Sequence, residues 1–394
     1  MRRLALPGSV WALGFVSLLM DVSSEMIHGL LPAFLVGALG VTPLVVGLID
    51  GASEALVYVT KLFSGAWSDR IGRRKPLLLA GYGLAALSKP LFPLADSALT
   101  VLGARLLDRF GKGIRGAPRD ALIADVTPGE DRGAAFGLRQ SMDTVGAFAG
   151  PLLAMLLMML SGNSMRFVFS WAVLPAALAV LVLWLAVREP EARTKRAGGA
   201  RGFPIRRAEL AKLPAGFWSV LAVGAVLSLA RGSEAFLVLR AESQGLSEAL
   251  LPLTLIVMNV VYAGAAYPLG KLSDRWPRRR LLWLGLLLLA VAQGLLALPG
   301  LAWTAAGVAL YGLHMGATQG VLAALIADRS PEHLRGTAFG LFNLVVGTAT
   351  LLAGGLVGLL WTQGGAALAY MVCAVLAVGA FAALPLLMPR RRAV

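Results

Sequence analysis

The chain has 394 residues, of which 58% are hydrophobic and 14% are charged, whereas an average soluble domain is about 45–50% apolar and about 25% charged. The mean hydropathy of +0.75 comes from apolar runs of about 20 residues, each long enough to cross a bilayer core about 30 Å thick. This composition excludes a soluble enzyme. The net charge of +15 lies mostly in short basic tracts between the runs, which favours a positive-inside membrane topology over nucleic-acid binding.

Twelve apolar runs follow one another along the chain, and we expect each to form a membrane-spanning helix. The first run resembles a signal peptide, but it carries Asp21 and Glu25 and has no clear small-residue cleavage site, so we expect it to be retained. The spans are predicted at residues 9–37, 44–67, 77–95, 98–122, 133–160, 165–188, 213–239, 248–270, 281–298, 301–327, 336–361 and 366–388.

Lys and Arg gather in every second gap between the spans. Two gaps on the other side, 37–43 and 299–302, are short and contain neither residue. Because cytoplasmic loops carry the excess of basic residues, both termini are predicted to be cytoplasmic. The Ala, Leu, Gly and Arg content and the lack of a targeting segment favour a plasma membrane, in particular a bacterial inner membrane.

Two stretches of sequence occur twice and divide the chain into halves. The stretch GAWSDRIGRRK at 65–75 recurs as GKLSDRWPRRR at 270–280, and residues 121–138 recur at 324–341. We therefore expect one six-helix half in residues 1–188, a basic cytoplasmic linker in 189–212 and a second six-helix half in 213–394.

The first copy of this loop resembles the signature of the major facilitator superfamily, which lies between helices 2 and 3 of each half. The second copy departs from it at Pro277, where the family usually has Gly. The resemblance implies an all-α membrane protein with twelve helices in two pseudo-symmetric halves, working by alternating access about a central site.

The resemblance also implies a cytoplasmic gate, in which charge pairs hold the helix ends together. The alternative is that the basic residues only fix the orientation in the membrane, but this does not explain the acid at position 69. The expected gate residues are Gly65, Asp69, Arg70, Gly72, Arg73, Arg74, Asp125, Arg132, Asp274 and Arg275.

Acids occur on one face of each of the first two spans. Asp21, Glu25 and His28 stand at i, i+4 and i+7, and Asp50 and Glu54 are one turn apart. A charge at mid-membrane costs about 2.5–3.5 kcal/mol on insertion scales, so such a group normally faces a wet cavity. We expect the four acids to be proton-coupling sites. The alternative is that some of them pair with basic residues and only hold helices together.

The fourth span carries five basic and two acidic residues between 105 and 120. A stripe of four must face protein or water rather than lipid: Arg105, Asp108, Arg109 and Lys112. Facilitator relatives carry an Arg on this helix that is linked to proton transfer. Arg105 fits its spacing to Asp125, and Arg109 is the other candidate. A structural ion-pair network is the alternative.

The fifth span indicates the direction of transport. Its Gly and Pro residues match the core of the antiporter motif of drug-exporting facilitators, although the final Gly pair of that motif is missing. The match favours export over uptake, while the alternative is that Gly and Pro are frequent in all membrane helices. The matching residues are Gly137, Gly146, Gly150 and Pro151.

The second half contains mostly uncharged polar candidates, so proton coupling is expected in the first half, with an apolar wall for lipophilic substrates in the second. Each candidate could instead be plain helix packing. The expected substrate-cavity residues are His28, Lys112, Asp143, Arg231, Glu234, Asn259, Tyr262, Tyr311, His314 and Asn343.

No phosphate-binding loop and no nucleophile elbow occur in the sequence, and the single Cys373 leaves no cysteine cluster. We therefore expect no enzyme, cofactor or metal. The leading hypothesis is a monomeric, proton-coupled exporter of a small amphipathic molecule or drug, whose partners are its substrate, protons and the lipid bilayer. One alternative is a transporter of an anionic metabolite or chelate bound by the basic stripe of the fourth span. Another is a transport-dead membrane scaffold or sensor.

Overall fold

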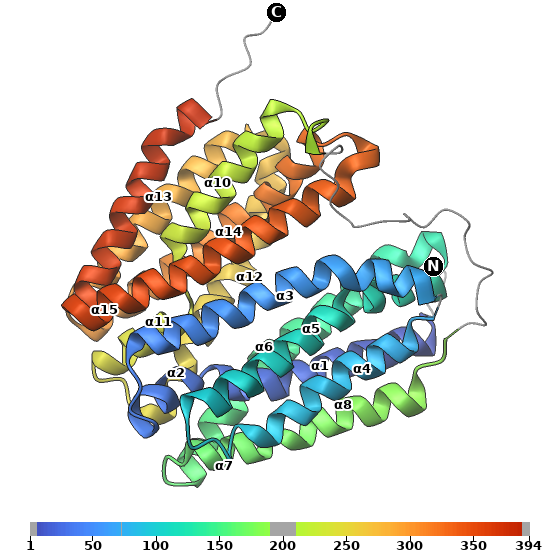
Figure 1. Cartoon of the computed structure of the whole chain (residues 1–394), viewed down its shortest axis with the longest axis horizontal. Helices are drawn as coiled ribbons and strands as arrows, with labels where there is room; N and C mark the ends of the chain where they lie inside the picture. Colours follow the sequence, from blue (N-terminus) through green and yellow to red (C-terminus); the bar gives the residue numbers. More distant parts are fainter. Residues whose placement is uncertain (1–5, 72, 190–209, 388–394) are drawn as a thin grey trace, which may run out of the picture. The chain divides into compact units, whose positions relative to one another are not determined.

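The computed structural model describes residues 6–71, 73–189 and 210–387, and Figure 1 shows their arrangement into helices. The described residues contain no strand, and the fold is that of an all-α membrane protein. Contacts divide the chain into two compact units. Unit 1 comprises Met1–Phe34 and Leu56–Gly202, and unit 2 comprises Leu35–Ala55 and Phe203–Val394. Helix α3 (Pro43–Ile71) is therefore shared, because its first part belongs to unit 2 and its second part to unit 1.

Unit 1 is built from long helices joined by short turns. Its first span begins as α1 and continues beyond a break at Gly29 into α2 and a π-helical turn, of which Leu35–Ala38 are assigned to unit 2. The elements are α1 (Gly8–His28), α2 (Leu31–Ala33), η1 (Phe34–Ala38), α4 (Lys75–Ser88), η2 (Lys89–Leu91), α5 (Ala98–Val126), η3 (Gly129–Asp131), α6 (Arg132–Leu160), α7 (Met165–Trp171) and α8 (Val173–Ala186).

Unit 2 also contains long helices, and its last helix is broken. The 53 residues of α15 are interrupted at Gly365, where φ is 79° and ψ is 176°, a backbone conformation that glycine adopts without a steric cost. The break falls between the last two predicted spans. The elements are α10 (Ala215–Arg231), α11 (Ala235–Ser243), η4 (Glu248–Leu250), α12 (Pro252–Arg275), α13 (Arg278–Ala297), α14 (Leu301–Arg329), η5 (Glu332–Leu334) and α15 (Arg335–Leu387).

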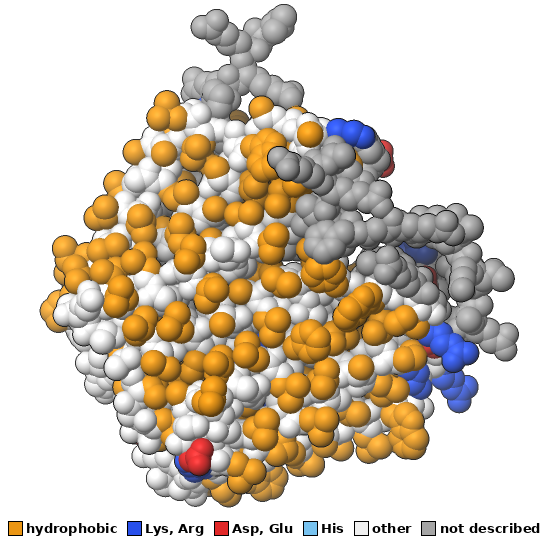
Figure 2. Space-filling model, in the orientation of Figure 1, with side chains coloured by type: hydrophobic (Ala, Val, Ile, Leu, Met, Phe, Trp, Pro, Cys, Tyr) orange, Lys and Arg blue, Asp and Glu red, His pale blue; other side chains and the backbone are white. Residues whose placement is uncertain are grey.

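Helix occupies every span that the sequence predicts. In the described part of the chain, nine helical segments are long and apolar enough to cross a membrane. Helix α4 is shorter, with 14 residues, and α5 is long enough but carries the charges predicted for the fourth span. Figure 2 shows hydrophobic side chains spread widely over one face of the molecule and few charged ones. Trp184 and Leu160 are among the exposed hydrophobic side chains, with exposed fractions of 62% and 72%. A soluble protein rarely exposes so much apolar surface, and lipid covers such a surface in a membrane protein.

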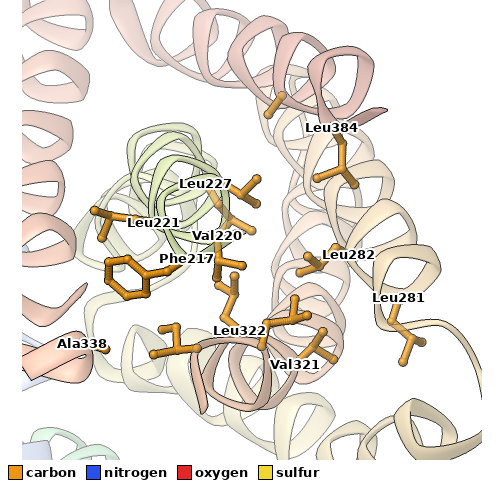
Figure 3. Close-up of a cluster of buried hydrophobic side chains, with 14 of the residues drawn as sticks. Phe217, Val220, Leu221, Leu227, Leu281, Leu282, Val321, Leu322, Ala338 and Leu384 are labelled. Atoms are coloured by element: carbon orange, nitrogen blue, oxygen red, sulfur yellow. The ribbon is translucent and has the colours of Figure 1, made fainter. Parts of the chain in front are cut away.

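Each unit has an apolar core of its own. In unit 2, side chains from α10, α13, α14 and α15 point toward one another (Figure 3), among them Phe217, Leu282 and Leu322. In unit 1, the core includes Leu13 of α1 and Tyr82 of α4, together with small residues of α8. These cores hold the helices whose polar faces are described next.

Candidate functional site

One face of α1 carries the ionisable residues of the first span. Asp21, Glu25 and His28 are partly exposed, while Met26 and Ile27 between them are buried. His28 Nδ1 lies 3.5 Å from Glu25 Oε2. The predicted spacing therefore places all three side chains on the same accessible face.

Helix α6 packs against this face through its glycines. A Cβ at Gly146 would lie 2.7 Å from the carbonyl oxygen of Leu18 and 3.0 Å from the Cβ of Asp21. A Cβ at Gly150 would lie 2.8 Å from the Cβ of Glu25. Only glycine fits at these two positions, because the backbones of α1 and α6 lie too close together to leave room for a side chain. Small residues allow such a close approach of membrane helices. Gly137 has no such neighbour within 4 Å, and Pro151 lies buried beside Gly150.

The basic residues of α5 act on the acids of α1. Asp21 interacts electrostatically with Lys112, Arg115 and Arg119 of α5 and with Asp143 of α6. Glu25 interacts with Lys112 and Arg109. Lys112 is exposed, whereas Arg105 and Arg109 are buried. The structure thus brings together acids and basic residues that the sequence placed on two separate spans.

An ion-pair network continues this charged face toward α6. Arg119 donates a hydrogen bond to Ser17 Oγ at 2.8 Å, and its Nη1 lies 3.7 Å from Asp143 Oδ1. Arg139 donates to Asp143 Oδ2 at 3.0 Å. Sequence reasoning missed Arg139, although its i, i+4 spacing to Asp143 was a usable signal. We call Asp21, Glu25, Lys112, Arg119 and Asp143 the charged face of unit 1.

A buried ion pair joins η2 to α5. Lys89 Nζ donates to Asp108 Oδ1 at 2.8 Å and to Ser24 Oγ at 3.0 Å. Lys89 is 1% exposed and Asp108 is 3% exposed. Lys89 was not predicted as a functional residue, since a lysine near a helix end normally extends its ammonium group to the membrane surface. Asp108, expected among the basic stripe, is held by this lysine.

The acids of the second span belong to unit 2. Asp50 is buried, and its Oδ2 accepts a hydrogen bond from Ser233 Oγ at 2.5 Å. Glu54 lies one turn further along α3, at the end of the segment that packs with unit 2. The four candidate proton acceptors are therefore assigned to two units: the α1 pair belongs to unit 1 and the α3 pair to unit 2.

The predicted cavity residues of unit 2 fall into two groups. Some lie near one another: Tyr311 interacts electrostatically with Arg231, Glu234 and Asp50, and Tyr262 is close to Arg231 and Glu234. Tyr262 also donates to Gln319 Oε1 at 3.0 Å.

The other group is placed differently. His314 is fully buried and its Nδ1 lies 2.7 Å from the carbonyl oxygen of Gly285, so it joins α14 to α13. Asn259 and Asn343 are partly exposed. Among the described residues, no three His, Cys, Asp or Glu side chains gather in a way that could hold a metal ion.

One ion pair occurs at the repeated motifs of each unit. Arg74 Nε lies 3.6 Å from Asp125 Oδ2 in unit 1, and Arg278 pairs with Asp328 in unit 2. By sequence alignment Arg278 corresponds to Arg73 rather than Arg74. Pro277 explains this difference between the two copies. Helix α13 begins directly after Pro277, at Arg278, whereas α4 begins at Lys75, which is two positions later in the repeat. A proline just before the first helical residue is compatible with the helix, as its nitrogen lacks a hydrogen to donate.

Most of the other residues expected in the gate are exposed or have side chains outside the described part of the structure. Gly72 lies outside the described residues, as do the side chains of Asp69, Arg70, Asp274 and Arg275. Arg73 and Arg132 are exposed, and a Cβ at Gly65 would make an ordinary contact of 3.6 Å with Ala117. Glu189 was not predicted. Its carboxylate accepts the backbone N–H groups of Arg74 and Lys75, at the N-terminus of α4, where a negative charge is favourable.

The profile of the Major Facilitator Superfamily matches residues 13–258 and 229–394 of this sequence. The chain belongs to this superfamily. It is 31% identical over 365 residues to an uncharacterised MFS-type transporter of Methanocaldococcus jannaschii, a match that covers 90% of this chain and 88% of the relative.

Further relatives point the same way. A tetracycline resistance protein, class C, of Escherichia coli is 27% identical over 325 residues, which is 78% of this chain and 80% of the relative. The structure of a bacterial homologue of the human lysosomal transporter Spinster superimposes with a TM-score of 0.76 and 19% identity over 96% of both chains. The chain is therefore a multi-pass membrane transporter of the major facilitator fold and not an enzyme, as the residue patterns predicted.

Proposed function

We propose that this transporter exports a small amphipathic molecule from the cytoplasm in exchange for protons. The observation that carries the proposal is the packing of Gly146 and Gly150 directly onto the part of α1 that bears Asp21 and Glu25. The antiporter-like stretch of the sequence and the candidate proton acceptors thus form one structural element. The similarity to a tetracycline resistance protein supports export of a drug-like molecule.

The charged face of unit 1 suits an exchange of proton and substrate. Asp21 lies near both the acid Asp143 and the basic Lys112, Arg115 and Arg119, so its protonation changes the net charge that a substrate meets. A substrate with a positive or hydrogen-bond-donating group binds the ionised carboxylate, and a proton arriving there displaces it. Exchange follows because the two ligands favour different charge states of the same site.

A flux assay tests this proposal. Purified protein is reconstituted into vesicles that hold a pH-sensitive dye, a proton gradient is imposed, and lipophilic cations, neutral drugs or organic anions are added. We expect cations or neutral drugs to release protons from the gradient. Asp21→Asn and Glu25→Gln should abolish this response in folded protein, whereas Glu332→Gln, at an exposed acid of η5, should leave it intact. Full gradient-driven flux through both of the first two variants would exclude these acids as coupling sites.

A second candidate function is the transport of an anionic metabolite or chelate. In η2 and α5, four basic side chains but only one acidic side chain, that of Asp108, are buried. A carboxylate or phosphate on a substrate would bind such a group of basic side chains through charge-assisted hydrogen bonds. In the same vesicles, a response to organic anions alone, lost in Arg109→Ala, would favour this function. No proton release with any compound of the panel, in protein shown to be folded, would favour a scaffold or sensor.

We also propose that the Arg74–Asp125 and Arg278–Asp328 pairs belong to a cytoplasmic gate. Both pairs are partly exposed, and an exposed ion pair contributes only about 0–1 kcal/mol. Such pairs are weak enough to break in each transport cycle. This assignment, with both termini cytoplasmic in a bacterial inner membrane, can be tested by labelling single cysteines from each side of the membrane.

A further inference from the structure

The first part of α3 packs tightly on α15 within unit 2. A Cβ at Gly51 would lie 2.9 Å from the Cα of Leu351, and a Cβ at Gly358 would lie 2.6 Å from the carbonyl oxygen of Pro43. Gly47 and Gly354 face each other so closely that neither could carry a side chain. Both helices thus have glycines four residues apart at the contact, the spacing that allows close helix packing in membranes. We call this contact the glycine seam.

A buried hydrogen bond lies beside the glycine seam. Asp50, located between Gly47 and Gly51, accepts the hydroxyl hydrogen of Ser233 at 2.5 Å. The same hydroxyl oxygen accepts the backbone N–H of Ala235 at 3.2 Å, at the start of α11. Asp50 and Ser233 are 8% and 7% exposed. Ser233 therefore connects the acid of α3 to the beginning of α11.

Several ionisable groups surround this bond. On α3 itself the nearest acid is Glu54, one turn away. The junction of α10 and α11 contributes Arg231 and Glu234, and α14 contributes Tyr311, whose ring interacts electrostatically with Asp50 and with both junction residues. Helix α15 carries no charged residue after Arg335, and its titratable groups are Tyr370 and Cys373. No charged side chain of α15 therefore faces Asp50 across the glycine seam.

We infer that Ser233 is a positioning residue for Asp50, and that the bond between them is a proton-sensitive latch which holds the first part of α3 on α15. This inference rests on the proposed function, in which Asp50 is a candidate proton acceptor. Helix association within lipid depends on close packing and on hydrogen bonds between helices, so the bond between Asp50 and Ser233 adds to the glycine contacts in holding the seam.

A proton on Asp50 replaces a charge-assisted hydrogen bond with a neutral one, which is about half as strong. We expect the docking equilibrium of residues 43–51 to shift by about tenfold toward release. Loss of the Ser233 hydroxyl should have a similar effect, because the ionised carboxylate then lacks this donor.

Spin labels on α3 and α15 measure the docking directly. In a Cys373→Ala background, labels are placed at Leu48→Cys and Leu352→Cys, whose native side chains are 44% and 59% exposed. Pulsed electron resonance then reports the distance between the two labels in reconstituted protein at about pH 3 and at about pH 9, which lie below and above the ordinary aspartate pKa of about 3.9. We expect one docked distance at high pH and an added longer distance at low pH.

Variants at the latch assign the effect to its residues. Asp50→Asn and Ser233→Ala should show the longer distance at both pH values, and Ser233→Thr, which keeps a hydroxyl group, should restore the pH response. Ser228→Ala is the matched control, because it removes a buried hydroxyl of α10 that bonds only to the carbonyl oxygen of Gly224. A second label pair at Val260→Cys and Leu352→Cys, between α12 and α15, should keep one distance throughout.

The outcomes separate the latch from the proposed function. A docked distance that is unchanged at low pH and in Asp50→Asn overturns the latch, even if the vesicles show proton exchange. A pH-dependent distance that follows Asp50 and Ser233 supports the latch, even if no tested substrate moves protons. A longer distance in the control pair as well would indicate general unfolding and would also overturn it.

Discussion

Removal of the Lys89 ammonium group tests whether the buried charges of unit 1 are coupled. In Lys89→Met, the carboxylate of Asp108 keeps its burial but loses the partner that now lies 2.8 Å away. Both side chains are at most 4% exposed, so water cannot replace the lost contact without a rearrangement. Breaking a buried pair by removing one partner costs about 3–5 kcal/mol.

A loss of this size lowers the midpoint of thermal unfolding by about 10 °C for a unit of this length. The assay follows the monodisperse fraction of detergent-purified protein after heating. Lys212→Met serves as the matched control, because this lysine is exposed at the end of the linker and its removal should leave the midpoint unchanged.

The double variant Lys89→Met with Asp108→Leu decides the interpretation. Replacing a whole buried pair with apolar side chains of similar volume is often neutral or stabilising, so we expect most of the loss to be recovered. Recovery should be incomplete, because Asp108 also interacts with Arg109 and Arg115. If the two single losses simply add in the double variant, or if Lys89→Met unfolds like the wild type, the pair is not coupled and the reasoning is refuted.

Three further variants test other contacts. Gly150→Leu should abolish export in the vesicle assay, because the leucine side chain would overlap α1. Gly137→Leu should retain export, because a Cβ at Gly137 has no neighbour within 4 Å. Equal activity of the two variants would contradict the packing argument. Arg278→Ala should lower stability by less than about 1 kcal/mol, since its ion pair is exposed, and a larger drop in the unfolding midpoint would show a structural role. His314→Phe should lower the midpoint of thermal unfolding by several degrees and leave substrate preference unchanged, because His314 is buried against α13. An altered substrate preference would place His314 in the transport path.

Much of the fold could be predicted because membrane helices leave a strong signal in sequence. Apolar runs of bilayer length located the spans, and the break of α15 at Gly365 falls where two runs were separated. Arg74 and Asp125, two of the expected gate residues, form an ion pair, whereas Arg278 and Asp328, which form the pair in the second half, were not among the expected gate residues. These features depend on local sequence, which periodicity and repeats report well.

The contacts between distant residues could not be predicted in this way. Lys89 was overlooked because its position near a span end is typical of a residue that reaches the membrane surface, and only the fold shows that Asp108 and Ser24 meet it. The docking of α3 on α15 was also missed. A signal for it was present, because Gly47 and Gly51, like Gly354 and Gly358, have the spacing of closely packed membrane helices.

The assignment of the acids to two units changes how proton coupling should be dissected. A proton on Asp21 alters the charge that faces Lys112 and Asp143 in unit 1, whereas a proton on Asp50 alters a bond that holds α3 within unit 2. If coupling needs both events, Asp21→Asn should block proton flux while the α3–α15 distance still responds to pH. Asp50→Asn should fix that distance while Asp21 still titrates. Measuring flux and distance in both variants separates substrate exchange from the movement of α3, and identical defects in the two variants would contradict this division.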